Sequence, residues 1–285
     1  MPYIEHALGR TWYTVRGSRA KNIPLIALHG GPGSGHSSML PYLDLCHSRQ
    51  VILYDQLGCG RSGLTDKKRW TVATFVRELD LLLKAWGITE FHLLGTSWGG
   101  TLALEYHLRK HPGRLKTLTL QSPMVSALDW QRDANKLLKA LPDKTRKVIR
   151  YCHEIGATDS RVYAQAMFEF YSRHVLRNKL ELRKKNPRSK GGQQIYEHMW
   201  GPSEFQVTGT LKNFDRTREL SSVNVPTLFV CGEYDESTPR SARKYQSRIK
   251  NARLEVVKNA SHVIAKEKPA VLKRIVGRFL EQNDG

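Results

Sequence analysis

A glycine-rich turn around a serine constrains the fold of this chain more than any other feature. Residues 95–100 read Gly-Thr-Ser-Trp-Gly-Gly; they follow an apolar run at 91–94, which predicts a buried strand, and precede helical spacing at 101–108. A strand that passes this directly into a helix leaves no room for a Cβ on the flanking glycines. We therefore expect a strained turn that exposes the Ser97 hydroxyl to the N–H groups of the following helix.

Predicted strands and helices alternate on both sides of this turn. The predicted strands are residues 11–15, 24–28, 51–54, 91–94, 115–120, 225–230 and 254–257, and the predicted helices between them are 72–86, 101–108, 239–249 and 269–281. Continuous apolar runs such as 51–54 are typical of strands covered on both faces. The order predicts an α/β fold, a mostly parallel sheet with helices on both faces.

The middle of the chain breaks this alternation. Residues 124–220 are helical in character, basic and poor in strand signals. We expect them to form a helical cap inserted into an α/β core, which residues 1–123 and 221–285 build. A length of 285 residues suits one large domain with such an insertion.

Composition argues against several protein classes. The chain has no run of 18 or more apolar residues, so no transmembrane helix is expected, and residues 1–6 lack the basic start and apolar stretch of a signal peptide. Its four cysteines are scattered, without a C-x-x-C pair or the spacing of a zinc site. Free thiols and a cytoplasmic location are the simplest interpretation.

Half of the formal net charge of +20 lies in residues 131–190, within the predicted cap. Residues 131–190 hold 16 Lys/Arg against 6 Asp/Glu, most densely at 183–190. Nucleic-acid binding also requires interleaved aromatic residues or a recognised module, and this run shows neither. We interpret the run as a solvated face and expect no nucleic-acid partner.

The turn around Ser97 is similar to the nucleophile elbow of α/β-hydrolases. A serine hydroxyl becomes a good nucleophile when a histidine, oriented by a carboxylate, takes its proton. In that fold the order along the chain is serine, acid, histidine. Asp235 and His262 follow the last two predicted strands, where the fold needs the acid and the base, and Glu233 and Glu236 are rivals to Asp235.

A second glycine-rich loop follows the predicted strand at 24–28. Residues 29–33 read His-Gly-Gly-Pro-Gly, so the backbone can approach a substrate closely there. We expect the N–H groups of Gly31 and Trp98 to form an oxyanion hole. No metal and no organic cofactor is expected.

Four segments together resemble the proline iminopeptidases, almost end to end. They are residues 29–33, 55–62 (Asp-Gln-Leu-Gly-Cys-Gly-Arg-Ser), 95–100 and 232–236 (Gly-Glu-Tyr-Asp-Glu). The resemblance is closest to the branch that includes archaeal tricorn-associated aminopeptidases and bacterial amino-acid amidases. It implies an α/β-hydrolase with a helical cap, which removes one N-terminal residue, often proline, from short peptides.

The resemblance also implies an anchor for the α-ammonium group of the substrate. In the family, one carboxylate comes from a cap motif that Gly-Pro-Ser-Glu-Phe at 201–205 matches, which gives Glu204, and another directly follows the triad aspartate, which gives Glu236. Two carboxylates facing one buried site repel unless a cation lies between them. The expected partners are therefore short peptides or aminoacyl amides with a free N-terminus.

The sequence leaves two points open. One is the reaction. A serine aminopeptidase is favoured over an amidase or esterase of the same fold. A third, less favoured alternative is a binding protein without enzymatic activity, whose basic cap would bind a polyanion. The other is the first residue of the substrate. Five cap aromatics either wall a pocket for proline or another apolar side chain, or pack in a core: Tyr163, Phe168, Phe170, Tyr171 and Trp200.

Overall fold

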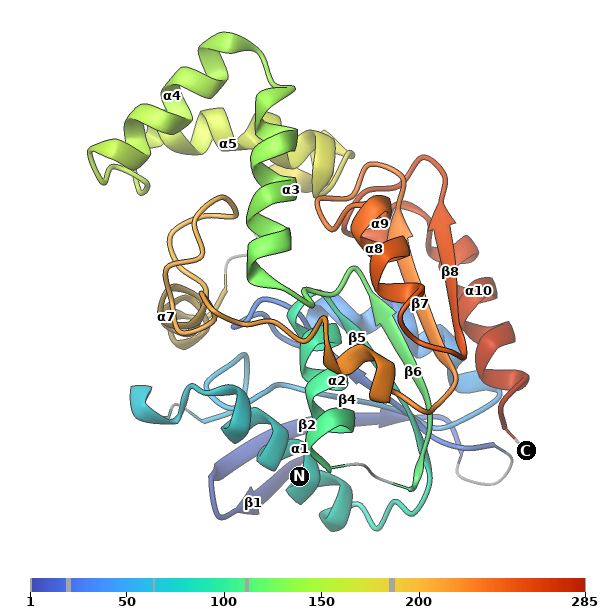
Figure 1. Ribbon diagram of the computed structural model, residues 1–285. Helices are drawn as coiled ribbons and strands as arrows, with labels where there is room; N and C mark the ends of the chain where they lie inside the picture. The colour runs from blue at the N-terminus through green and yellow to red at the C-terminus, as the bar shows by residue number, and fades with distance from the viewer. Residues whose placement is uncertain (1, 19–21, 64, 111–112, 185–187, 285) are drawn as a thin grey trace.

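The computed structural model describes residues 2–18, 22–63, 65–110, 113–184 and 188–284, and within them eight strands form one sheet. The sheet order is β1-β2-β4-β3-β5-β6-β7-β8 (Figure 1). The strands are β1 (Tyr3–His6), β2 (Gly9–Arg16), β3 (Leu25–Leu28), β4 (Val51–Tyr54), β5 (Phe91–Thr96), β6 (Leu115–Gln121), β7 (Thr227–Gly232) and β8 (Ala252–Val257). Pairing is antiparallel from β1 to β4 and parallel from β4 to β8, which confirms the predicted α/β class.

Strand β3 shows how the sheet is buried on both faces. Ile26 and Leu28 lie in one hydrophobic cluster, and Leu25 and Ala27 lie in a second cluster on the opposite face. The alternation follows from the period of two in a strand. Helices α1 (Val72–Ala85), α2 (Trp98–Lys110), α8 (Pro239–Gln246), α9 (Ile264–Glu267) and α10 (Pro269–Glu281) belong to the same alternating part of the chain, as do the 3₁₀ segments η1 (His36–His47), η2 (Lys67–Arg69) and η3 (Glu219–Ser222).

The chain reverses its direction of winding across the sheet at β3. From β3 it runs to β4 on one side, and it then returns to β5 on the other side of β3. The carboxyl ends of β3 and β5 are therefore adjacent, with Leu28 paired to Gly95. In open α/β sheets, ligands bind in the crevice at such a switch point.

In the described part of the chain, five α-helices lie between the neighbouring strands β6 and β7: α3 (Ala127–Lys139), α4 (Asp143–Glu154), α5 (Arg161–His174), α6 (Lys179–Arg183) and α7 (Lys190–Met199). Figure 1 shows α3, α4, α5 and α7 lying beyond one end of the sheet. The helical character predicted for the middle of the chain is confirmed, whereas the domain boundaries at 123/124 and 220/221 stay a prediction. Of the predicted basic run 183–190, residues 185–187 lie outside the described residues.

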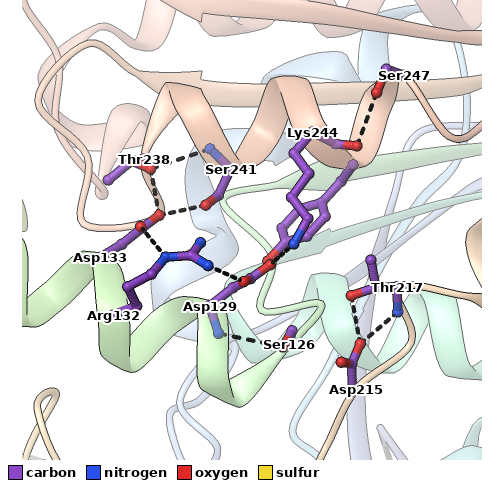
Figure 2. A network of polar contacts seen from close by, with 11 residues as sticks. Ser126, Asp129, Arg132, Asp133, Asp215, Thr217, Thr238, Ser241, Lys244 and Ser247 are labelled. Atoms are coloured by element: carbon purple, nitrogen blue, oxygen red, sulfur yellow. Dashed lines mark hydrogen bonds and ion pairs between the residues drawn. The ribbon is translucent and has the colours of Figure 1, made fainter.

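Two aspartates on α3 hold this helix against α8 of the sheet part (Figure 2). Asp129 accepts hydrogen bonds from the Lys244 ammonium (2.6 Å) and the Tyr245 hydroxyl (2.9 Å). One turn later, Asp133 accepts from the Thr238 hydroxyl (2.6 Å). Charge-assisted hydrogen bonds of this kind are stronger than neutral ones, so α3 has a defined position over the sheet.

Among the described helices, none is long and apolar enough to cross a membrane.

Candidate active site

Ser97 lies between the last residue of β5 and the first residue of α2, in the left-handed region with a φ of +54°. Its N–H donates to the carbonyl oxygen of Gln121 on β6 (2.8 Å). A Cβ on Gly95 would collide with the backbone of Gly99, and a Cβ on Gly99 would collide with the carbonyl oxygen of Leu28. The tight turn predicted from the sequence is confirmed, and it projects a strained serine beside a helix N-terminus.

The structure brings Asp235 and His262 together at the ends of β7 and β8. His262 Nδ1 lies 2.8 Å from Asp235 Oδ1. The buried Asp235 also accepts from the N–H of Ser237 (2.8 Å) and the hydroxyl of Ser122 (2.5 Å). Its carboxylate is thus held as an acceptor, which assigns the Nδ1 proton of His262 and leaves Nε2 for proton exchange.

Two opposing effects act on the pKa of His262. Burial, the largest single effect, lowers it, but the charge and the hydrogen bond of Asp235 together with the charges of Glu204 and Glu267 outweigh burial, so the pKa lies above its usual 6.5. A base whose pKa is raised toward neutral is well matched to taking a proton from a hydroxyl near neutral pH.

The glycine loop after β3 runs directly against the elbow. A Cβ on Gly30 would lie 3.0 Å from the carbonyl oxygen of Thr96 and 3.1 Å from the Cβ of Ser97. Gly31 has a φ of +117°, which favours glycine, and both Gly31 and Trp98 line the same cavity as Ser97. The backbone of this loop therefore lies close to Ser97, and the oxyanion role of Gly31 and Trp98 stays a prediction.

Gln56 ties these two loops together, a role that sequence reasoning missed. Its backbone N–H donates to His29 Nε2 (3.0 Å), and its side-chain amide donates to the carbonyl oxygen of His29 (2.9 Å). Its amide oxygen accepts from the indole N–H of Trp98 (2.8 Å). The Asp-Gln motif at 55–56 was used only for the family resemblance, although its place after β4 puts it beside the loop from β3.

Glu204 and Glu236, the predicted amine anchors, line one cavity with Ser97 and His262. The hydroxyl of Tyr196 donates to Glu204 (2.7 Å). Glu236 is buried, and its Oε2 has no hydrogen-bond partner in the described part of the chain. Burial and then the charges of Glu204 and Asp235 raise the pKa of Glu236 well above its usual value. A cation in the cavity would relieve this repulsion.

The cap also contacts the loops of the sheet through its backbone. The carbonyl oxygen of His174, the last residue of α5, accepts from the N–H of Glu236 (3.3 Å) and the N–H of His262 (3.2 Å). The position of two site residues thus depends on the cap as well as on the strands.

The cavity has a volume of about 230 Å³. Of the five cap aromatics named from the sequence, Trp200 lines it, whereas Phe170 and Tyr163 pack in the hydrophobic cluster. Trp130 on α3, which the sequence did not single out, packs edge-on against both Trp200 (5.4 Å) and His262 (5.9 Å). The apolar wall therefore comes from two separate parts of the cap.

No group of three or more His, Cys, Asp or Glu that could hold a metal ion occurs among the described residues.

Comparisons with known proteins identify the family and the fold. The α/β-hydrolase fold family matches residues 23–269. A proline iminopeptidase of Heyndrickxia coagulans is 38% identical, over 98% of this chain and 97% of its own length. A crystal structure of a proline iminopeptidase from Mycobacterium smegmatis has a TM-score of 0.88 at 32% identity, and one of VinJ has 0.91 at 32% identity; both alignments cover 99% of this chain and 98% of the other.

Proposed function

The chain belongs to the α/β-hydrolase family and, within it, to the proline iminopeptidases, and on that basis we propose that it is a serine aminopeptidase releasing the N-terminal residue of short peptides. One observation carries the proposal. A single cavity contains the elbow serine, the histidine paired with a buried carboxylate, and two further carboxylates suited to a free amine. We also propose a cytoplasmic location, and the boundaries 1–123, 124–220 and 221–285 for core, cap and core.

In the proposed reaction, Ser97 Oγ attacks the first peptide carbonyl carbon while His262 takes the hydroxyl proton. The N–H groups of Gly31 and Trp98 hold the oxyanion that forms. The C–N bond then breaks, and the leaving amine takes the proton from His262. Asp235 keeps the imidazole in one tautomer and stabilises its charged form.

Water completes the cycle on the resulting acyl-enzyme ester. It gives a proton to His262 and adds to the ester carbonyl; the C–O bond to Ser97 then breaks, and Ser97 takes the proton back. The free amino acid leaves, so no net oxidant or reductant is consumed.

Glu204 and Glu236 bind the α-amino group in this proposal. Burial and the charges of Glu204 and Asp235 raise the pKa of Glu236, and a bound ammonium group would favour its ionised form. The edge-on pair Trp130 and Trp200 offers an apolar wall that suits a pyrrolidine ring.

A panel of aminoacyl arylamides tests the proposal. Prolyl, alanyl, leucyl and phenylalanyl arylamides are compared with a simple acyl ester, using the wild-type protein and Ser97→Ala. We expect the prolyl arylamide to react fastest and Ser97→Ala to be inactive on every substrate. A protein that hydrolyses the ester but none of the arylamides is an esterase, and the proposal then fails.

A further inference from the structure

Arg188 places a positive charge in the same cavity as the two glutamates. It lines the cavity, and its guanidinium carbon lies 3.9 Å from the centre of the Tyr196 ring. The hydroxyl of that ring donates to Glu204. Tyr196 therefore contacts the Arg188 cation with its ring face and donates its hydroxyl hydrogen to the Glu204 carboxylate. Both contacts are favourable, because the ring face is electronegative and the phenol is a hydrogen-bond donor.

Arg188 and Glu236 each have a buried polar atom without a hydrogen-bond partner among the described residues. In Arg188 this atom is the guanidinium Nε. In Glu236 it is Oε2, and the ion pair of Glu236 is with His262 at 3.9 Å. Buried polar atoms are rarely left unpaired, so an anion near Arg188 and a cation near Glu236 would complete the site.

The segment that follows Arg188 packs against the glycine loop at 29–33, which we propose holds the substrate carbonyl. Arg188 directly precedes Ser189, which caps α7 by accepting from the N–H of Gly192 (3.1 Å). A Cβ on Gly33 would collide with the carbonyl oxygen of Gly192, so the start of α7 is pressed against the glycine loop at 29–33. Arg188 thus lies where that loop meets α7.

We propose that Arg188 binds the C-terminal carboxylate of a dipeptide, so that free dipeptides are the preferred substrates. The inference rests on the proposed function and names its substrate class: a zwitterion whose ammonium group lies at Glu204 and Glu236 and whose carboxylate lies at Arg188. A guanidinium fork matches a carboxylate bidentately. The cavity, at about 230 Å³, is smaller than the range of about 300–1,000 Å³ typical of pockets for drug-sized ligands. A short substrate fits that size.

The test compares prolyl-glycine with prolyl-glycinamide, which differ only in the charge at the C-terminus. The wild-type protein should have a kcat/KM about 10- to 100-fold higher for the acid than for the amide. In Arg188→Met this ratio should fall to near one, and in Arg188→Lys it should be intermediate. Arg183→Met is the matched control, because it removes an exposed cation from the same basic run; it should keep the wild-type ratio.

Two results would overturn the inference. One is a wild-type ratio near one, and the other is an Arg188→Met variant that loses the same factor on the acid and the amide, which would mean that Arg188 only supports Tyr196 and Glu204. The prolyl arylamide separates these failures from a failure of the proposed function. If the wild-type protein cleaves the arylamide, the function stands while the dipeptide preference falls.

Discussion

The two walls of the cavity are built on different principles. On the sheet side, the backbone fixes the position of the nucleophile, since Ser97 is held at a φ of +54° and the glycines at 95 and 99 exclude any side chain. On the helical side, the groups are placed by contacts between side chains, such as Tyr196 with Glu204 and Trp130 with Trp200. The difference suggests that the sheet wall performs the bond chemistry, whereas the helical wall, together with Glu236 from the loop after β7, selects the substrate.

The largest effect expected on the sheet wall comes from Ser97→Ala. Removing the nucleophile should lower kcat by roughly 10⁴- to 10⁶-fold on aminoacyl arylamides and simple esters alike. Ser38→Ala is the matched control, because Ser38 also lines the cavity but its hydroxyl donates to the carbonyl oxygen of Gly35 (2.8 Å). Initial rates of both variants, with thermal melts to check folding, measure the effect. Substantial turnover by Ser97→Ala would remove Ser97 from the chemistry.

On the helical wall, Glu204→Gln should change discrimination rather than chemistry. Losing one charged acceptor for the ammonium group should lower kcat/KM for aminoacyl arylamides by about 10- to 100-fold. A simple acyl ester, which has no amine, should react almost as before. Glu197→Gln, an exposed change on the same helix as Tyr196, is the control and should alter neither rate. Equal losses on both substrates would make Glu204 part of the general machinery.

Gln56→Ala probes the brace between the glycine loop and the elbow. Without its hydrogen bonds to His29 and Trp98, the oxyanion donors should lose alignment, and kcat should fall about 10-fold on amides and esters by the same factor. A loss confined to substrates with a free amine would instead assign Gln56 to recognition and blur the distinction between the walls.

The smallest effect expected is a shift of the acid limb of the pH–rate profile. His262 must be neutral to act as a base, and its pKa is raised, so kcat/KM on an ester should fall as the pH drops through a value above 6.5. The charge of Glu204 contributes to that rise, so Glu204→Gln should move the limb to lower pH. A limb that stays in place or moves upward in this variant would contradict the coupling between the walls.

The sheet wall could largely be predicted from the sequence, because its signals are local. The run at 51–54 matches β4, and the helix predicted at 269–281 matches α10. The edge strand β1 and the 3₁₀ segment η1 were missed, since β1 reads Tyr-Ile-Glu-His, without a continuous apolar run, and η1 contains Pro41.

The helical wall was harder to predict, because its contacts join distant segments. Trp130 meets Trp200 across 70 residues of sequence, and no periodicity reports such a contact. Arg188 belongs to a basic run that was interpreted as a solvated face, yet this side chain lines the cavity. Glu204 was located only because a short motif around it resembles a family pattern.

The most direct test of the account compares a prolyl arylamide with the same compound N-acetylated. The two share the leaving group and the scissile carbonyl, so Ser97 and His262 face the same bond in both. The account predicts a kcat/KM at least about 100-fold higher for the free amine, because acetylation removes the cation that Glu204 and Glu236 bind. Equal rates on the two compounds would contradict the account.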